Sequence, residues 1–240
     1  MRITATSILF LAVTALLQSC KREPPPAVDY KYNYFPLTIG HTVEYYVDSV
    51  LYNPLFAGGK KNVSWQVKEV VESEFKDNAG RDAFRIERYI RPNDSAQWTI
   101  SNVWYAVLEQ TRAERVEENL RFIRMVFPPK SGTKWNGNIY IPTSDTFEFY
   151  HNWSYTYSAV DEPATLNGFT FDSTCTVIEV ADSSSLIDMR YSKAIYAKHV
   201  GLIYKDLYDL RYQDTIPAPP GPWEQKANRG YITRIRLKDY

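Results

Sequence analysis

From residue 41 to the end of the chain, hydrophobic and polar residues alternate in short runs that are separated by turn-forming residues. Alternation with a period of two is typical of strands that bury one face. The polar turn at residues 76–81 joins two such runs and predicts a β-hairpin. The runs interpreted as strands are residues 41–52, 64–75, 82–91, 98–108, 120–127, 174–181, 202–213 and 231–240.

Two segments between these runs are candidates for helix. Residues 188–200 are the best one, because Ile195 and His199 are four apart and Gly201 follows as a C-terminal stop. The charged connection 109–119 is long enough for one helical turn. The strands at 98–108 and 120–127, which it joins, would then pair with each other. The chain is therefore predicted to be mainly β, with about nine or ten strands and one short helix near 188–200. A single curved antiparallel sheet would form an open barrel or a sandwich.

The most regular pattern lies in residues 147–157. On a strand, the residues at its alternate positions would share one face: Phe147, Phe149, His151, Trp153, Tyr155 and Tyr157. The simpler interpretation is that this face packs as the core of the sheet. It can also line an apolar ligand cavity, and a histidine on a pure core face would need a polar partner. These residues are therefore candidate ligand-binding residues, together with Trp223 in the proline-rich loop 214–229.

The start of the chain predicts export. Arg2 precedes an uncharged apolar run at residues 3–17, which is too short for a permanent membrane span and is typical of a secretory signal. The run ends in Leu17-Gln18-Ser19-Cys20, which resembles the lipobox of bacterial lipoproteins. The resemblance implies cleavage before Cys20 and acylation of that cysteine, so that several acyl chains hold the protein on a bilayer. Lys21 favours anchoring in the outer membrane, on either its periplasmic or its outer face.

The residues after Cys20 predict a spacer and then one domain. Pro24-Pro25-Pro26 favours an extended conformation, which would hold the folded part off the membrane surface. No second domain boundary is evident. The expected organisation is a signal peptide at 1–19, a lipidated cysteine and tether at 20–33, and a single β-rich domain at 34–240.

Composition narrows the function classes. The chain carries 28 Lys and Arg and 28 Asp and Glu, so no basic excess indicates binding to nucleic acid. Cys175 is the only cysteine besides Cys20 and lies in a strand pattern, where it is interpreted as a small buried hydrophobic residue. Aromatic residues make up 15% of the chain, which favours sheet over helix.

Three phrases, in this order, resemble a group of uncharacterised envelope lipoproteins common in Bacteroidetes. They are Tyr-Phe-Pro-Leu-Thr-Ile-Gly at 34–40, Gly-Thr-Lys-Trp at 132–135, and Tyr-Ala-Lys-His-Val-Gly-Leu-Ile-Tyr at 196–204. The common form of the last phrase has glycine where this chain has His199. The resemblance implies an envelope location and an all-β fold, and it brings no known activity.

Motifs for catalysis are missing from the sequence. There is no Gly-x-Ser-x-Gly, no phosphate-binding loop and no His-Glu-x-x-His, and His41, His151 and His199 are far apart. No metal or cofactor is therefore expected. The favoured function is non-enzymatic binding of an apolar or glycan ligand, or of a protein partner, by a membrane-anchored lipoprotein. A structural or assembly component of an envelope complex is the alternative, and a glycan-active hydrolase ranks third because its paired carboxylates need not be close in sequence.

Overall fold

The computed structural model describes residues 27–143, 145–214 and 219–240. The predicted signal peptide, Cys20 and the proline run of the tether lie outside these residues, so cleavage and lipidation stay predictions. Within the described part of the chain, no helix has the length and apolar character needed to cross a membrane.

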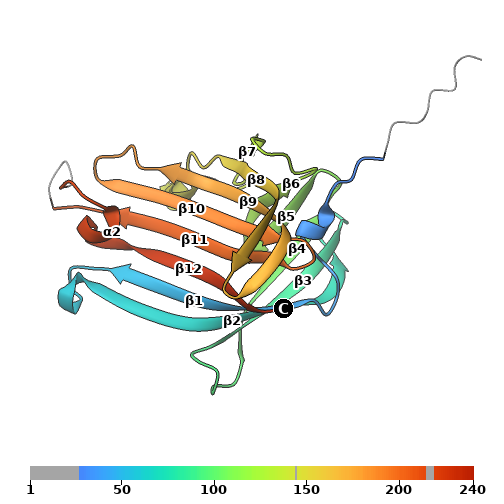
Figure 1. The fold of residues 1–240 in the computed structure, drawn as a ribbon, viewed down its shortest axis with the longest axis horizontal. Helices are drawn as coiled ribbons and strands as arrows, with labels where there is room; N and C mark the ends of the chain where they lie inside the picture. Colours follow the sequence, from blue (N-terminus) through green and yellow to red (C-terminus); the bar gives the residue numbers. More distant parts are fainter. Residues whose placement is uncertain (1–26, 144, 215–218) are drawn as a thin grey trace, which may run out of the picture.

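The described residues form twelve strands and a few short helical turns (Figure 1). The first six strands are β1 (Thr42–Tyr52), β2 (Lys60–Lys76), β3 (Asp82–Arg91), β4 (Thr99–Leu108), β5 (Arg112–Glu117) and β6 (Leu120–Val126). The last six are β7 (Lys134–Trp135), β8 (Tyr155–Leu166), β9 (Phe169–Asp182), β10 (Asp188–Ala197), β11 (Gly201–Arg211) and β12 (Arg229–Asp239). The short helical segments are η1 (Tyr32–Tyr34), η2 (Ala57–Gly59), η3 (Asp145–Tyr150) and α2 (Trp223–Lys226).

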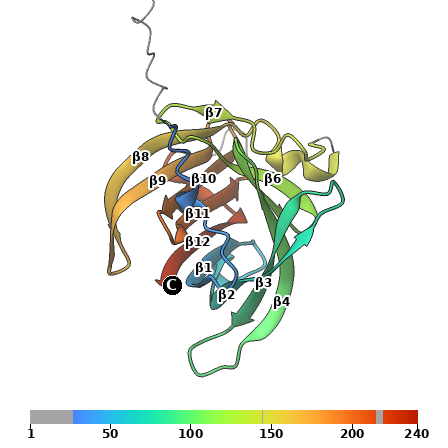
Figure 2. The same ribbon diagram turned by 90° about the vertical axis from the view of Figure 1, so that its right-hand side faces the viewer.

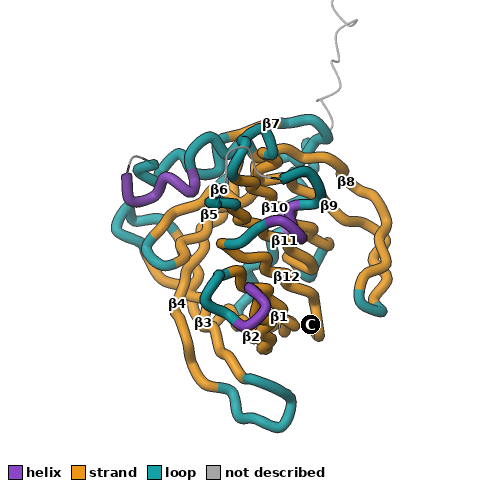
Figure 3. Tube along the Cα trace, turned by 90° about the vertical axis from the view of Figure 1, so that its left-hand side faces the viewer, coloured by secondary structure: helices purple, strands orange, loops and turns teal. Residues whose placement is uncertain are grey.

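All strands belong to one antiparallel sheet, in the order β6-β5-β4-β3-β2-β1-β12-β11-β10-β9-β8-β7. Consecutive strands therefore lie side by side except β6 and β7, which form the two edges of the sheet, and β1 pairs with β12. The sheet curves until its two edges, β6 and β7, approach one another, so that it is nearly closed into a barrel (Figure 2 and Figure 3). This confirms the prediction of a mainly β, curved antiparallel sheet and selects the barrel over the sandwich.

A seam remains between β6 and the strands that follow it. Few hydrogen bonds bridge it: the Ile123 N–H donates to the carbonyl of Gly137 at 2.8 Å, and the Trp135 indole donates to the carbonyl of Ile123 at 2.9 Å. The Tyr157 hydroxyl donates to the carbonyl of Val126 at 2.8 Å and accepts from its N–H at 3.0 Å. Side chains therefore complete the barrel where the backbone ladder stops.

The segment before β1 covers one end of the barrel, as Figure 2 shows for η1. Tyr34 and Phe35, from the Tyr-Phe-Pro-Leu phrase, are buried in the largest core cluster. The Tyr34 hydroxyl bonds to Asp161 at 2.9 Å and to Ser173 at 2.7 Å. Burial of an aromatic ring with a satisfied hydroxyl is strongly favourable, so this phrase holds the N-terminal segment against β8 and β9.

The predicted hairpin is present, because β2 and β3 pair antiparallel across the turn at residues 77–81. The alternation in the first predicted strand is also real: Val43, Tyr45 and Val47 are buried, while the residues between them are half-buried. Cys175 is fully buried in β9, and burial raises the pKa of its thiol to about 12. Such a thiol behaves as the small hydrophobic residue that the sequence indicates.

The helix expected at 188–200 is wrong, since Asp188–Ala197 is strand β10. Ser192, Ala194 and Tyr196 are buried at a period of two, and β10 is paired on both sides, with β9 and β11. Most of the expected helix therefore belongs to the sheet, and residues 198–200 form the turn that follows β10. The glycine interpreted as a helix stop instead follows a hairpin turn.

The expected helical turn at 109–119 is also wrong, because Arg112–Glu117 forms β5. This strand lies between β4 and β6, so the strands at 99–108 and 120–126 are not direct partners. Most of its charged side chains form ion pairs, so the charges of this segment do not mark a turn exposed to solvent. The total of twelve strands exceeds the expected nine or ten because β5, β10 and the short strand β7 were not predicted.

Candidate functional site

A cavity of about 260 Å³ lies inside the barrel. Its walls come from strands on both sides of the seam and from the segment between β7 and β8. Aromatic and aliphatic side chains form much of the lining, among them Trp104, Phe149, Trp153, Leu207 and Tyr231. Pockets of this kind, mostly apolar with a few placed polar groups, are the usual form of a small-molecule site.

Charged side chains run through this cavity in alternating sign. The order of contact is Arg88, Glu69, Arg115, Glu117, Arg124, Glu179 and Lys205, a series that we call the luminal charge chain. All of these except Glu179 line the cavity directly. Charges in a protein interior are energetically unfavourable unless each is paired and hydrogen-bonded. A series of seven such side chains inside a barrel is therefore unusual.

The first half of the luminal charge chain joins β2, β3 and β5. The Arg88 Nε donates to the Glu69 carboxylate at 2.8 Å, and an Nη of Arg115 donates to the other oxygen of Glu69 at 2.6 Å. The Arg115 Nε lies 3.5 Å from an Oε of Glu117. Glu69 and Arg88 are direct cross-strand partners, and such partners project to the same face of a sheet.

The second half crosses the seam. An Nη of Arg124 on β6 lies 2.8 Å from Glu117, and its other Nη donates to Glu179 on β9 at 3.2 Å. The Lys205 ammonium on β11 donates to both oxygens of Glu179, at 3.0 and 2.8 Å. The Ser192 hydroxyl also donates to Glu179, at 2.6 Å. Glu179 is therefore saturated, with three donor side chains around a carboxylate that is 1% exposed.

The three carboxylates of the luminal charge chain are held ionised. Burial works to raise the pKa of Glu69, but the Arg115 and Arg88 guanidiniums outweigh it and lower that pKa. For Glu117, burial is likewise opposed by Arg124 and Arg115, which lower its pKa to about 2. For Glu179, the charges of Lys205 and Arg124 overcome burial in the same way, and its pKa is lowered. At neutral pH these groups accept hydrogen bonds and do not donate protons.

Aromatic rings support the cations of the luminal charge chain. The Arg88 guanidinium lies 3.7 Å from the centre of the Trp104 ring, and Arg115 lies 4.8 Å from the same ring. The Arg124 guanidinium lies 4.1 Å from the centre of the Phe122 ring. Stacking of this kind fixes a guanidinium in one orientation and is favourable in a site shielded from water.

The interpretation of residues 147–157 as one strand is wrong. Phe147, Phe149 and Tyr150 lie in η3, His151 and Asn152 form a turn, and the strand begins only at Tyr155. The rings therefore do not share the face of one strand. Phe149 and Trp153 nevertheless line the cavity, and the chain turn brings Tyr150 beside them although the pattern placed it on the opposite face.

The other candidate residues lie elsewhere. Tyr155 and Tyr157 are fully buried in the core, where Tyr155 donates to Asn138 at 3.0 Å. Phe147 is half-buried in η3 outside the cavity lining, and His151 is exposed in the turn. Trp223 lies in α2 at the end of the barrel far from η1 (Figure 1), packed against the core cluster that includes Tyr52 and Leu210. The structure thus brings together two of the seven candidates at the cavity.

Sequence reasoning missed the luminal charge chain, although a signal for it is present. Glu69 falls in the same set of alternate positions as its strand's apolar residues Trp65, Val67 and Val71. In the same way, Arg88 falls in the set of Phe84, Ile86 and Ile90. Glu179 and Lys205 also share the parity of buried positions, next to Val177 and Ile203. A charged residue within the apolar half of an alternating strand is the sequence signal of a paired interior charge.

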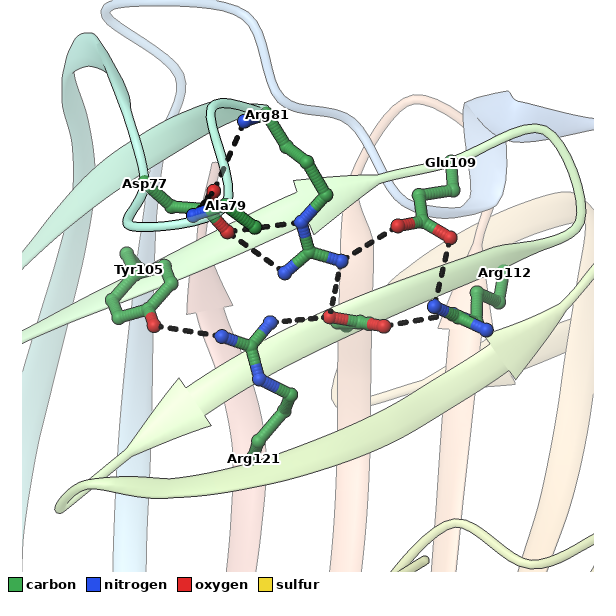
Figure 4. A network of polar contacts seen from close by, with 8 residues as sticks. Asp77, Ala79, Arg81, Tyr105, Glu109, Arg112 and Arg121 are labelled. Atoms are coloured by element: carbon green, nitrogen blue, oxygen red, sulfur yellow. Dashed lines mark hydrogen bonds and ion pairs between the residues drawn. The ribbon is translucent and has the colours of Figure 1, made fainter. Parts of the chain in front are cut away.

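A second charged cluster lies around the turns that flank β5, and Figure 4 shows its guanidinium and carboxylate groups. Glu114, 1% exposed, accepts from Arg112 at 2.7 Å, from Arg81 at 3.1 Å and from Arg121. Asp77 accepts from the Arg81 guanidinium and from two backbone N–H groups of its own turn. Because these groups satisfy one another, the cluster holds the β2–β3 turn against β5 and leaves no opening for a ligand.

No histidine belongs to the cavity. The His41 ring is 3.1 Å from the carbonyl of Val200, and the His199 ring is 3.4 Å from the Asn33 amide. In the described part of the chain, no group of three His, Cys, Asp or Glu side chains is placed to hold a metal ion.

No protein-family model and no curated protein matches the sequence. Solved structures do show a likeness. A candidate exported protein with a YmcC-like fold from Bacteroides fragilis is 11% identical at a TM-score of 0.38, over 85% of this chain and 98% of that one. A candidate lipoprotein from Parabacteroides distasonis is 14% identical at a TM-score of 0.33, over the same shares of the two chains. A candidate outer membrane lipoprotein-sorting domain from Vibrio parahaemolyticus is 12% identical at a TM-score of 0.19, over 87% of each chain. These identities and TM-scores are too low to indicate what this chain binds.

Proposed function

We propose that this protein is a non-enzymatic binding protein of the bacterial envelope, anchored by lipid at Cys20, which holds a small ligand in its barrel cavity. The observation that carries the proposal is the cavity itself. Interiors of proteins are close-packed, and voids larger than a water molecule are few. A space of about 260 Å³ between aromatic walls and paired charges is therefore better explained as a site than as imperfect packing.

The electrostatics of the cavity favour binding over catalysis. Hydrolysis of a glycoside needs one carboxylic acid with a raised pKa beside an ionised carboxylate. Here Glu69, Glu117 and Glu179 all have lowered pKa values, because arginine or lysine side chains contact each of them. A glycan-active hydrolase is accordingly the weaker assignment.

The N-terminal segment supports a position close to the membrane. The first described residues lead into η1, which covers one end of the barrel (Figure 2). The seven Cα–Cα steps from Cys20 to Ala27 can span at most about 25 Å. Acylation of Cys20 would therefore place this end of the barrel near the bilayer, with the α2 end pointing away from it.

The ligand is proposed to lie between the two halves of the barrel, against Phe149 and Trp153. Trp153 is held in place by its indole N–H, which donates to the carbonyl of Phe149 at 2.8 Å. Leu207, on β11, lines the same space from the other half of the barrel. A purely structural component would gain nothing from maintaining a cavity here, which is why the assembly alternative is less well supported.

The test uses residues 21–240, which contain every described strand and core residue and omit the lipid. N-phenyl-1-naphthylamine, an uncharged aromatic probe whose emission rises in apolar sites, is titrated into the protein. We expect saturable binding near one probe per chain. Leu207→Trp, which places a larger ring in the cavity, should abolish that binding while circular dichroism and the melting temperature report an intact fold. Absence of binding, or equal binding by Leu207→Trp, would overturn the proposal.

A further inference from the structure

The luminal charge chain is not electrically balanced. It begins with Arg88 and ends with Lys205, so cations occupy both of its ends. Four cations therefore face three carboxylates across the cavity: Arg88, Arg115, Arg124 and Lys205 against Glu69, Glu117 and Glu179. An uncompensated charge in a partly enclosed site is unfavourable, and an anion from outside the chain would balance it.

Arg88 has donors to offer such an anion. Only its Nε has a hydrogen-bond partner among the described residues, the carboxylate of Glu69. Its two Nη groups have none there, and the side chain retains 16% exposure at the cavity wall. Trp104 stacks against its guanidinium and holds the fork in one orientation. A planar fork with free donors is suited to a carboxylate, sulfonate or phosphate group.

The remainder of the cavity suits an apolar body. Phe149, Trp153 and Leu207 line it together with Tyr231 and Ile235, so the cavity combines an apolar lining with the donors of the luminal charge chain. A ligand with one anionic group and one apolar part would satisfy both kinds of lining. An uncharged apolar ligand would leave the excess cation unmatched, and a small inorganic anion would leave the rings uncovered.

We infer that the cavity ligand is a small amphiphilic anion, whose charged group binds Arg88 and whose apolar body lies against Phe149, Trp153 and Leu207. This inference rests on the proposed function, since it names the chemical class of the ligand for the same cavity.

A matched pair of probes separates charge from shape. 8-Anilino-1-naphthalenesulfonate has the ring skeleton of N-phenyl-1-naphthylamine and carries one sulfonate in addition. We expect the sulfonate probe to bind residues 21–240 at least tenfold more tightly than the neutral probe, because a hydrogen bond to a charged group contributes about a factor of ten or more. Equal or weaker binding of the sulfonate would overturn the inference and leave the proposed function standing. Binding of neither probe would instead contradict the proposed function.

Variants locate the anion. Arg88→Gln should lose the preference for the sulfonate while it keeps its affinity for the neutral probe. Arg85→Gln is the matched control, because it removes one positive charge from the same strand at a site where Arg85 pairs with Glu72 and Glu87 away from the cavity. It should keep the preference. If Arg88→Gln does not fold, Arg88→Lys, which keeps a positive charge beside Glu69 but removes the planar fork, should reduce the preference. A preference that persists in every folded cavity variant would overturn the inference.

Discussion

Glu179 is the most enclosed carboxylate of the luminal charge chain. Its oxygens accept from Lys205, Arg124 and Ser192 in a site that is 1% exposed. Removing one member of a buried charge pair is far more damaging than its net contribution suggests, because the partner stays buried without compensation. The same carboxylate connects β6, β10 and β11 to β9, so its loss would affect both halves of the barrel.

Glu179→Gln is therefore expected to destabilise the protein by about 3–5 kcal/mol, since Lys205 and Arg124 would face a neutral amide. Urea unfolding followed by tryptophan fluorescence measures this difference. Glu72→Gln is the control: Glu72 is half-exposed and pairs with Arg85 at 2.9 Å, so the loss should be much smaller. A loss for Glu179→Gln no larger than that of the control would contradict a structural role for the buried carboxylate.

At the scale of single elements, the turn between β10 and β11 explains a feature of the sequence. His199 has a φ of 65°, in the left-handed region that favours glycine. The lipoprotein phrase that residues 196–204 resemble commonly has glycine at this position, and the left-handed backbone gives the physical reason. His199 tolerates the conformation with help from its backbone N–H, which donates to the carbonyl of Asn33 at 2.7 Å.

Substitutions at this turn should follow backbone preference rather than side-chain contacts. His199→Gly is expected to leave the melting temperature unchanged or to raise it. His199→Val should lower stability by about 1–2 kcal/mol, because a β-branched residue fits the left-handed region poorly. Thermal unfolding of the pair measures the contrast, and if valine were as stable as glycine, the turn could not have this conformation in solution.

At the scale of the whole molecule, the barrel is closed by backbone pairing everywhere except at the seam between β6 and β7. The luminal charge chain crosses that seam through Arg124, which contacts Glu117 on one side and Glu179 on the other. Charges therefore link the two halves at the place where strand pairing is incomplete. This arrangement makes the closure of the barrel dependent on the ionisation of its carboxylates.

The stability of the barrel should accordingly fall in acid. Glu117 has a pKa lowered from 4.5 to about 2, so the unfolded chain takes up its proton more readily than the folded one. The stabilisation is complete above about pH 5 and is lost as the pH falls towards 2, and Glu117 alone accounts for about 3 kcal/mol of it. Lowered pKa values at Glu69 and Glu179 act in the same direction.

Urea unfolding at a series of pH values from 7 to 2.5 measures this loss. Glu117→Gln should start from a lower stability at pH 7 and then depend less steeply on pH. Parallel curves for the two proteins would show that Glu117 has an ordinary pKa and that the seam is not held by this carboxylate.

The features that could be predicted from the sequence are local ones. Period-two alternation predicted strands at 41–52, 64–75 and 82–91 and the turn between the last two, because strand geometry places alternate residues on opposite faces, and these are β1, β2 and β3 of the structure. The general form of a curved antiparallel sheet followed from the number and spacing of such runs. At 188–200 the same kind of reasoning failed, because Ile195 and His199 at a spacing of four fit a helix while the pairing of β10 with two neighbours required a strand.

Only the tertiary structure decided which side chains meet inside the barrel. Glu69, Arg124 and Glu179 are far apart in sequence, and their contacts depend on strand register and on the approach of β6 to the far edge of the sheet. The aromatic stretch shows the same dependence, since Phe149 and Trp153 reach the cavity from a helical turn and a loop instead of from one strand face. Alternation along a strand specifies which residues point inward, whereas closure of the sheet specifies which side chains they contact there.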